Sequence, residues 1–329
     1  MKELCVIGSL NMDLVTTVGE FPKPGETIFG DSFKTFPGGK GANQAVALGK
    51  LGADVLMVGK VGDDIYGVKY LEVFKNSNVK QDGVDIEKGI SSGVAVINVN
   101  NKGENNIVVV SGANGEVDVN YIESKWDIIV KADIFLFQLE IPMETVVYTM
   151  KKLKDLGKTI ILDPAPASKL PDEIFNYIDF ITPNETELET LGSKKIDNED
   201  DLREAANILF DKGVKVIINK QGSRGAAIIR RNEYVNVPGF KVNAVDTTAA
   251  GDSFNAGFAF ALAQGKILDE CVKFANAVGA ISTTALGAQE AMPSYKVVRK
   301  FMDEQSRLNG ARKEGLDEGK KEGKIEVLN

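Results

Sequence analysis

The sequence predicts an α/β fold, in which a doubly wound, mostly parallel sheet carries helices on both faces and a small β-sheet forms a lid. The first observation behind this prediction is a series of short apolar runs that end near Gly, Pro, Asn or Asp, at residues 4–7, 55–58, 134–137, 159–162, 180–182, 216–218 and 226–229. The second is that helical patterns lie between most of these runs, for example at residues 41–51, 145–156 and 202–212. Apolar strands that alternate with helices are typical of a parallel sheet covered on both faces, and such sheets bind ligands at the carboxyl ends of their strands.

Two segments interrupt this alternation of strands and helices. Residues from about 11 to 36 contain Pro22, Pro24 and Gly25 but no helical pattern. Residues from about 91 to 110 contain two strand patterns joined by a turn. We expect both segments to form a small sheet that projects from the main body, either as a lid over a cleft or as a plain edge of the fold.

We expect one main domain at residues 1–302, followed by a charged tail at residues 303–329. Lys and Glu dominate this tail, Gly recurs through it, and apolar residues return only near its end. Such a composition favours a frayed helix or a disordered segment, to which we assign no function.

Composition excludes several classes of function. A net charge of −8 argues against a nucleic-acid-binding surface and favours a cytoplasmic protein that binds small molecules. The chain has no histidine, so any general base must be Asp, Glu, Lys, Tyr or Cys. Cys5 and Cys271 each lie in an apolar stretch and are expected to be buried, reduced thiols. No apolar run approaches the ~20 residues of a membrane span, and the N-terminus reads as a buried strand, not a signal peptide.

The segment from Val245 to Ala263 is the strongest candidate for chemistry. Its loop of small residues, Ala249, Ala250 and Gly251, leads directly into a small, apolar helical run. A helix start leaves unpaired N–H groups and a partial positive charge, which suit an anion such as a phosphate. Asp252 lies at this helix start and could take a proton from a hydroxyl group that attacks the phosphate. The alternative is that Asp252 caps the helix and that the small residues allow close helix packing.

A second glycine-rich site runs from Pro37 to Gln44 and enters the helix expected at residues 41–51. Its glycines and its short amide allow close backbone approach to a polar ligand, although a structural turn would have the same composition. The sequence contains neither G-x-x-x-x-G-K-[ST] nor G-x-G-x-x-G. It therefore lacks a Walker A loop, and a dinucleotide-binding protein is disfavoured.

Three further polar clusters follow predicted strands. The tripeptide Asn-Met-Asp at residues 11–13 could bridge two adjacent hydroxyl groups, because Asn donates and accepts whereas Asp only accepts; an Asx turn is the alternative. Asn184 and Glu187 could organise magnesium-bound water, or they could simply begin a helix with acidic first-turn residues. The stretch at residues 220–225 could approach a nucleotide or be only a hairpin turn.

With these features in chain order, the sequence resembles the ribokinase-like family of sugar kinases, the phosphofructokinase-B type, over about residues 1–300. The motifs that carry the resemblance are Asn11-Met12-Asp13, Gly38-Gly39-Lys40-Gly41-Ala42-Asn43-Gln44, Gln138-Leu139-Glu140, Asn184-Glu185-Thr186-Glu187, Gly222-Ser223-Arg224-Gly225 and Asp246-Thr247-Thr248-Ala249-Ala250-Gly251-Asp252. The resemblance implies an ATP-dependent sugar kinase, and conversion of D-ribose to D-ribose 5-phosphate is the expected reaction.

The resemblance also implies roles for the matching residues. Asp252 would be the general base, beside an anion hole formed by the N–H groups of Ala249, Ala250, Gly251 and Asp252. The sugar would be held by Asn11, Met12, Asp13, Gly39, Lys40, Gly41, Ala42, Asn43, Glu140 and Asp252. ATP, with Mg²⁺ on its phosphates, would be contacted by Asn184, Glu187, Lys220, Gln221, Gly222, Ser223, Arg224, Gly225, Gly251, Asp252 and Asn276.

A potassium ion and a homodimer are further implications of the resemblance. The ion would lie beside the anion hole, bound through Asp246, Thr248, Ser282, Ala285 and Gly287. Ala291 occupies the position where the family often carries a Ser that completes this potassium shell, and Lys220 occupies a position where it often carries Thr. The lid would also form the homodimer interface.

Other functions stay open on the sequence alone. A kinase for another pentose, a hexose or a nucleoside would belong to the same family. A non-catalytic protein that senses sugar or nucleotide is a different class, which the presence of Asp252 disfavours. A dehydrogenase is disfavoured by the missing dinucleotide-binding pattern.

Overall fold

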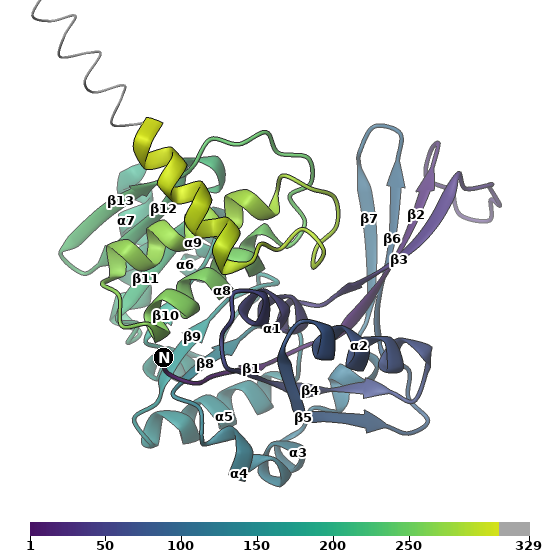
Figure 1. Ribbon diagram of the computed structural model, residues 1–329, viewed down its shortest axis with the longest axis horizontal. Helices are drawn as coiled ribbons and strands as arrows, with labels where there is room; N and C mark the ends of the chain where they lie inside the picture. The colour runs from purple at the N-terminus through teal and green to yellow at the C-terminus, as the bar shows by residue number, and fades with distance from the viewer. Residues whose placement is uncertain (309–329) are drawn as a thin grey trace, which may run out of the picture.

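The computed structural model describes residues 1–308 and contains the α/β fold expected from the sequence (Figure 1). Within these residues the main body is a nine-stranded sheet of order β13-β12-β11-β10-β9-β8-β1-β4-β5. The strands from β11 to β5 in this order run parallel, and β12 and β13 extend the β11 edge antiparallel. Their bounds are β1 (Leu4–Ile7), β4 (Val55–Gly62), β5 (Val79–Glu87), β8 (Ile134–Phe137), β9 (Thr159–Leu162), β10 (Phe180–Ile181), β11 (Val216–Lys220), β12 (Gly225–Arg230) and β13 (Glu233–Pro238).

The central strands are apolar throughout because both of their faces are covered. All four residues of β1 are buried between β8 and β4. Leu4 and Val6 pack in one apolar cluster, whereas Cys5 and Ile7 pack in a second cluster, as the two-residue repeat of a strand requires. Cys5 and Cys271 are both free and buried, which confirms the prediction from the sequence, and burial raises the pKa of the Cys5 thiol far above its ordinary value.

The helices divide between these two clusters and so cover the two faces of the sheet. The first cluster includes side chains of α1 (Lys40–Lys50), α2 (Ile65–Asn76), α8 (Ala250–Ala263) and α9 (Leu268–Ser282). The second includes side chains of α3 (Val119–Ser124), α4 (Trp126–Ile129), α5 (Met143–Asp155), α6 (Glu185–Gly192), α7 (Glu199–Asp211) and the 3₁₀ helix η2 (Asp172–Tyr177). Two more 3₁₀ helices, η1 (Gly112–Glu116) and η3 (Gly222–Arg224), lie in connections between strands or helices.

α8 is buried on nearly all sides, since Ala, Gly and Phe make up most of it. Gly257 lies so close to α9 that a Cβ atom there would be 3.0 Å from the Cα atom of Ala275. The small residues of this helix therefore do allow close helix packing, as one of the two interpretations of the sequence proposed.

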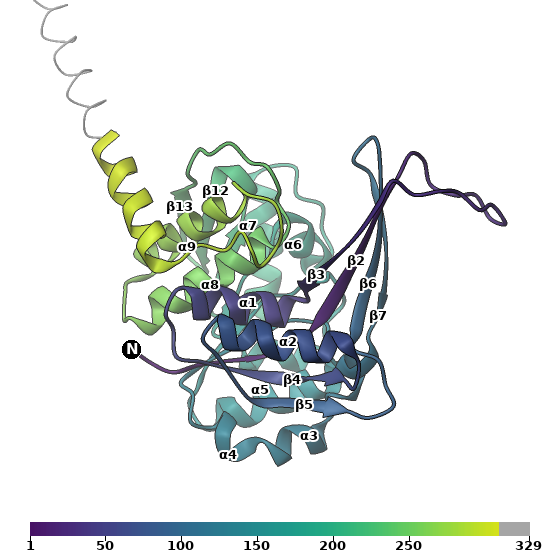
Figure 2. The same cartoon turned by 45° about the vertical axis from the view of Figure 1, so that its right-hand side comes forward.

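A second sheet of order β3-β2-β6-β7 projects from the main body (Figures 1 and 2). Its strands are β2 (Asn11–Val18), β3 (Ser32–Gly38), β6 (Gly93–Asn100) and β7 (Asn105–Val110). The turn between β6 and β7 is closed by Asn100, whose Oδ1 accepts hydrogen bonds from the N–H groups of Lys102 and Glu104, each at 3.0 Å. The small sheet expected from residues 11–36 and 91–110 is confirmed.

The last described helix occupies residues 295–308 and continues past the domain boundary expected at residue 302. The rest of the expected tail, residues 309–329, lies outside the described residues. In the part of the chain that the structure describes, no helix combines the length and the apolar character needed to cross a membrane.

Candidate active site

The helix start expected at residues 249–252 is the first turn of α8. Ala249 is its N-cap residue and adopts a left-handed backbone conformation with φ 57°, without a side-chain hydrogen bond to the helix. Such a conformation costs a non-glycine residue roughly 1–2 kcal/mol. The N–H of Ala250 donates to the carbonyl of Thr247 at 3.2 Å. The first-turn N–H groups that follow have no partner within the helix itself, so this end can present donors to an anion.

The carboxylate of Asp252 faces α1 and does not cap α8. The residue is only 6% exposed. Its Oδ2 accepts a hydrogen bond from Asn43 Nδ2 at 3.0 Å, and its Oδ1 accepts one from Gln44 Nε2 at 3.2 Å. Both amides belong to α1, so two helices meet at this carboxylate. The interpretation of Asp252 as a helix cap is therefore wrong.

The pKa of Asp252 is raised from 3.8 to about 6, mainly by burial. The charge of Lys40 and the hydrogen bonds from Asn43 and Gln44 act to lower this pKa, and the charge of Asp163 acts with burial to raise it. A carboxylate with a pKa close to the working pH is well matched to proton removal, because it is ionised at neutral pH and yet binds a proton readily. The electrostatic environment thus suits a general base.

A hydrogen-bond network extends from Asp252 to the strand β11. Gln44 Nε2 also donates to Asp163 Oδ2 at 3.0 Å, and Gln138 Nε2 donates to Gln44 Oε1 at 2.7 Å. Lys220 Nζ donates to Asp163 Oδ1 at 2.8 Å. No role was predicted from the sequence for Gln44, Gln138 or Asp163. Asp163 nevertheless directly follows the predicted strand at residues 159–162, and that position was the signal that could have found it.

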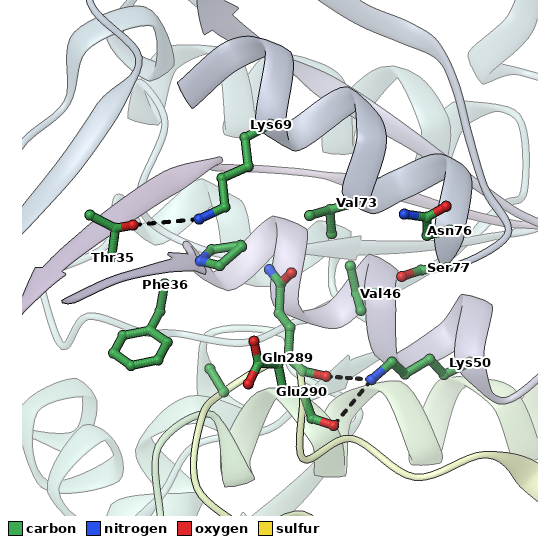
Figure 3. Close-up of a pocket in the computed structure, with 12 residues that line it drawn as sticks. Thr35, Phe36, Val46, Lys50, Lys69, Val73, Asn76, Ser77, Gln289 and Glu290 are labelled. Carbon is green, nitrogen blue, oxygen red and sulfur yellow. Dashed lines mark hydrogen bonds between the residues drawn. The ribbon is translucent and has the colours of Figure 1, made fainter. Parts of the chain in front are cut away.

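The loop at residues 288–290 holds Asn43 from its other side. Figure 3 shows the same loop accepting hydrogen bonds from Lys50 through Gln289 and Glu290. Gln289 Nε2 donates to Asn43 Oδ1 at 3.0 Å, which leaves the Nδ2 of Asn43 facing Asp252. Lys50 Nζ donates to the carbonyl of Gln289 at 2.6 Å and so fastens the loop to α1. A cavity of about 240 Å³ lies here, between α1, α2, the end of β3 and this loop.

The glycine-rich loop at the end of β3 lies directly against β2. Asn11 and Gly38 are partners across these two strands, and a Cβ atom on Gly38 would lie 2.3 Å from Asp13 Oδ2. Gly39 has φ 84°, and its Cβ would lie 2.6 Å from the backbone nitrogen of Asn11. Gly39 must be glycine, because its φ is positive and backbone atoms surround it, whereas a side chain at Gly38 would displace the carboxylate of Asp13.

The charged candidates for sugar binding share one electrostatic environment. Glu140 accepts hydrogen bonds from the hydroxyl of Ser9 and, at 3.0 Å, from the N–H of Lys40. The pKa of Asp13 is raised to about 7, first by burial and then by the charges of Glu140 and Asp252, while the charge of Lys40 acts to lower it. Burial alone would lower the pKa of Lys40, but it is raised above its ordinary value by the charges of Asp252, Asp163, Glu140 and Glu187. The structure therefore brings Asp13, Lys40, Glu140 and Asp252 together.

Two residues assigned to the sugar site do not present side chains to it. Met12 and Ala42 have no exposed surface and belong to the first apolar cluster. Met12 alternates with Asn11 and Asp13 along β2, so its side chain lies on the opposite face of the strand. Any contact of Met12 or Ala42 with a sugar would therefore come from the main chain, because these side chains pack the core beneath the site.

Asn184 and Glu187 form a capping box at the start of α6. Asn184 Oδ1 accepts from the N–H of Glu187 at 2.8 Å, and Glu187 Oε2 accepts from the N–H of Asn184 at 2.8 Å. Asn184 Nδ2 also donates to Glu187 Oε1 at 3.0 Å. The helix-start interpretation of this motif therefore holds, and Glu187 additionally lies near Lys220, with 3.9 Å between Oε2 and Nζ.

The stretch from Lys220 to Gly225 joins β11 to β12 as an antiparallel hairpin, with Lys220 opposite Ala226. The turn itself, at Gln221, Gly222, Ser223 and Arg224, includes the short helix η3, and Arg224 forms an ion pair with Glu185. The hairpin interpretation of this stretch therefore holds.

Asn276 on α9 donates from Nδ2 to the carbonyls of Val237, at 3.0 Å, and Pro238, at 3.3 Å. These hydrogen bonds tie α9 to the end of β13.

The candidate potassium ligands lie in the loop before α8 and at the end of α9 with the loop that follows it, and Asp246 joins the two regions. Its Oδ1 accepts from the N–H of Thr248 at 2.9 Å and from the Thr248 hydroxyl at 2.7 Å, and its Oδ2 accepts from the N–H of Gly287 at 3.0 Å. Partial burial acts to raise the pKa of Asp246, but these hydrogen bonds lower it below its ordinary value. The buried hydroxyl of Ser282 donates to the Gly279 carbonyl at 2.8 Å. Ala285 and Ala291 can offer only main-chain carbonyls.

A mostly parallel sheet with a buried carboxylate beside a helix start is the arrangement of an α/β small-molecule kinase. A family model described as "pfkB family carbohydrate kinase" matches residues 1–295, and the chain belongs to this family. It is 43% identical to a ribokinase of Bacillus subtilis over 92% of this chain and all of that protein. It is 38% identical to a deoxyribokinase of Salmonella typhi over 91% of this chain and 98% of that protein. The structure of Arabidopsis thaliana ribokinase complexed with ribose and ATP matches with a TM-score of 0.85 and 34% identity, over 91% of this chain and 98% of that one.

Proposed function

We propose that this kinase transfers the γ-phosphoryl group of ATP to the 5-hydroxyl of D-ribose and so forms D-ribose 5-phosphate. The observation that carries the proposal is the buried carboxylate of Asp252, held by two amides of α1 at the first turn of α8. The similarity to a bacterial ribokinase, and to a plant ribokinase bound to ribose and ATP, supports ribose as the acceptor.

In the proposed reaction, the 5-hydroxyl oxygen of the sugar forms a bond to the γ-phosphorus as the bond from that phosphorus to the β–γ bridging oxygen breaks. The hydroxyl proton passes to Asp252, and ADP leaves with the bridging oxygen. The N–H groups of the anion hole at residues 249–252, and the dipole of α8, stabilise the charge on the transferring group. Mg²⁺ on the ATP phosphates would neutralise part of their charge, near the carboxylate of Glu187.

The sugar would lie between the β2–β3 junction and α1. Asn11, Asp13 and Glu140 offer acceptors for sugar hydroxyls, and Lys40 offers a cation among them. The small sheet would act as a lid that excludes water from the transferring phosphoryl group. On the nucleotide side, the hairpin at residues 220–225, with Asn184 and Asn276, would contact ATP.

The acid limb of the pH–rate profile is expected to report Asp252. Its pKa is raised to about 6, and only the ionised form accepts a proton, so kcat/KM should fall as the pH drops through about 6. A coupled assay from pH 5 to pH 8, with the coupling enzymes in excess, measures this. The variant Asp13→Asn is the control, because Asp13 also has a raised pKa and its removal should leave the fall near pH 6 in place. A flat profile down to pH 5 would contradict the assignment.

A 2-deoxyribose kinase is the second candidate, because a deoxyribokinase is 38% identical to this chain. The two sugars differ only in the 2-hydroxyl, and a site that hydrogen-bonds a hydroxyl rejects an analogue lacking it. An ATP-consumption screen over free pentoses, 2-deoxyribose, hexoses and nucleosides decides between them. We expect the highest kcat/KM for D-ribose, and a higher value for 2-deoxyribose would replace the first proposal with the second.

We further propose that a potassium ion binds at Asp246 and Thr248, with main-chain carbonyls of the loops at residues 282–291. The donor set fits a weakly hydrated monovalent cation, since a single carboxylate with a lowered pKa lies among neutral oxygen atoms. The bound ion would strengthen the field of the anion hole. Replacement of potassium by sodium is expected to lower kcat, and the variant Asp246→Ala should abolish this difference. Equal rates in the two salts would remove the potassium site from the account.

A homodimer through the lid is the last part of the proposal. Every residue of β7 is exposed, and this strand at the edge of the sheet carries Ile107, Val108, Val109 and Val110, each at least 47% exposed. An exposed apolar edge strand favours pairing with another strand. Sedimentation is expected to show a dimer, and Val109→Lys should yield monomers. A monomeric wild-type protein at micromolar concentration would contradict this.

A further inference from the structure

The ion pair of Lys220 with Asp163 lies at the mouth of the candidate anion hole. The Lys220 side chain is 13% exposed and the Asp163 side chain 3% exposed, and the two are joined at 2.8 Å. A Cβ atom built on Gly251 would meet a single neighbouring atom within 4 Å, the Nζ of Lys220 at 3.6 Å. Apart from its chain neighbours and the backbone of its own helix, Gly251 therefore has the Lys220 ammonium as the nearest group on this side.

From this geometry we infer that Lys220 contacts the γ-phosphoryl group during transfer and that Asp163 is the residue that positions it. The inference rests on the proposed kinase function and assigns a side-chain role at a position where the wider family often carries Thr. An ammonium group and the N–H groups of a helix start would then hold the same phosphoryl group from two sides.

Asp163 connects this cation to the general base. Its Oδ1 accepts from Lys220 and its Oδ2 accepts from Gln44, whose Nε2 also donates to Asp252 Oδ1. Displacement of Asp163 would therefore disturb both the ammonium group and the carboxylate that receives the proton. Glu187 Oε2 lies 3.9 Å from Lys220 Nζ. The charges of Asp163 and Glu187 also raise the pKa of Lys40, so Lys220 and Lys40 share one acidic surrounding.

The opposing interpretation is that Lys220 only neutralises the buried Asp163. That role would affect folding, but it would not distinguish ATP from ADP. Contact with the γ-phosphoryl group predicts a specific pattern: removal of the charge weakens binding of a non-hydrolysable ATP analogue and leaves binding of ADP unchanged.

The test compares Lys220→Met with the matched control Lys60→Met. Lys60 is also 13% exposed and pairs with Glu87 at 2.7 Å, but it lies on β4, near the opposite edge of the sheet. Lys220→Met is expected to lower kcat by about 10²-fold, the usual effect of removing one preorganised donor, with the KM for sugar unchanged. The control should retain wild-type kcat. Calorimetry should show that Lys220→Met loses the preference for the ATP analogue over ADP.

Two further variants separate catalysis from folding. The double variant Asp163→Asn/Lys220→Met removes both charges of the buried ion pair, so it should fold even if the single variant does not. Asp163→Asn alone should lower kcat, and the double variant should be no slower than Lys220→Met, since both changes disable one unit. Near wild-type kcat in the folded Lys220→Met or double variant, or an intact preference for the ATP analogue, would overturn the inference. Wild-type protein that turns over no sugar would instead overturn the proposed function, while the nucleotide-binding comparison would still decide the role of Lys220.

Discussion

Replacement of Asp252 by Asn is expected to lower kcat by at least about 10³-fold while ribose still binds. General-base catalysis commonly contributes about 10²–10⁴-fold, and this site has a single buried carboxylate at the first turn of α8 to supply it. An amide cannot accept the proton of the sugar hydroxyl, but it fills the same volume between Asn43 and Gln44. Turnover is measured by a coupled assay and ribose binding by calorimetry.

A matched control for this variant is Asp118→Asn. Asp118 caps α3 by accepting a hydrogen bond from the N–H of Tyr121, and Asn is an equally good N-cap residue. This control should retain both its thermal stability and its kcat. Near-normal turnover in Asp252→Asn would exclude Asp252 as the base, whereas loss of ribose binding along with turnover would show that the carboxylate mainly holds the sugar.

Gly41→Ala is expected to lower both stability and turnover, although Gly41 is not one of the reacting groups. A Cβ atom at Gly41 would lie 2.6 Å from the backbone nitrogen of Ser9 and 2.7 Å from the carbonyl carbon of Gly8. Neither is the end of a flexible side chain, so α1 must move away from β1. We expect the free energy of unfolding to fall by roughly 1–3 kcal/mol, the usual cost of overpacking. Since α1 carries Asn43 and Gln44, a shift of about 1 Å should also lower kcat by about 10²-fold.

Gly19→Ala is the control for this prediction. A Cβ atom on Gly19 would have no neighbour within 4 Å, so the substitution should leave thermal stability and kcat close to those of the wild type. Chemical denaturation of both variants gives the comparison. If Gly41→Ala were as stable and as active as Gly19→Ala, the close approach of α1 to β1 would not be what positions the two amides.

The fold was predictable from the sequence where a strand is buried on both faces. The apolar runs of β1, β8 and β9 coincide with the predicted ranges, because every residue in them packs against one core or the other. β5 and β13 were missed because each lies at an edge of the large sheet and is only partly buried, with charged or polar residues among its apolar ones. Long-range packing, not a local pattern, makes them strands.

The candidate site was predictable where residues that are neighbours in the sequence form a helix start or a loop by themselves. The helix start beside Asp252 follows from the small residues before it, and the approach of Gly39 to Asn11 follows from the glycine-rich loop. The network through Gln44, Gln138 and Asp163 could not be read in the same way, because its members lie up to 119 residues apart and meet only across the sheet. For the same reason, the sequence could not show that Lys220 points toward the first turn of α8.

The most direct measurement is a crystal structure of the protein with D-ribose and a non-hydrolysable ATP analogue. The 5-hydroxyl oxygen should lie about 2.6–3.2 Å from a carboxylate oxygen of Asp252, the distance at which a general base can take its proton. The terminal phosphate should rest against the N–H groups at the start of α8. A sugar whose 5-hydroxyl points away from Asp252, or a terminal phosphate bound elsewhere, would contradict the account.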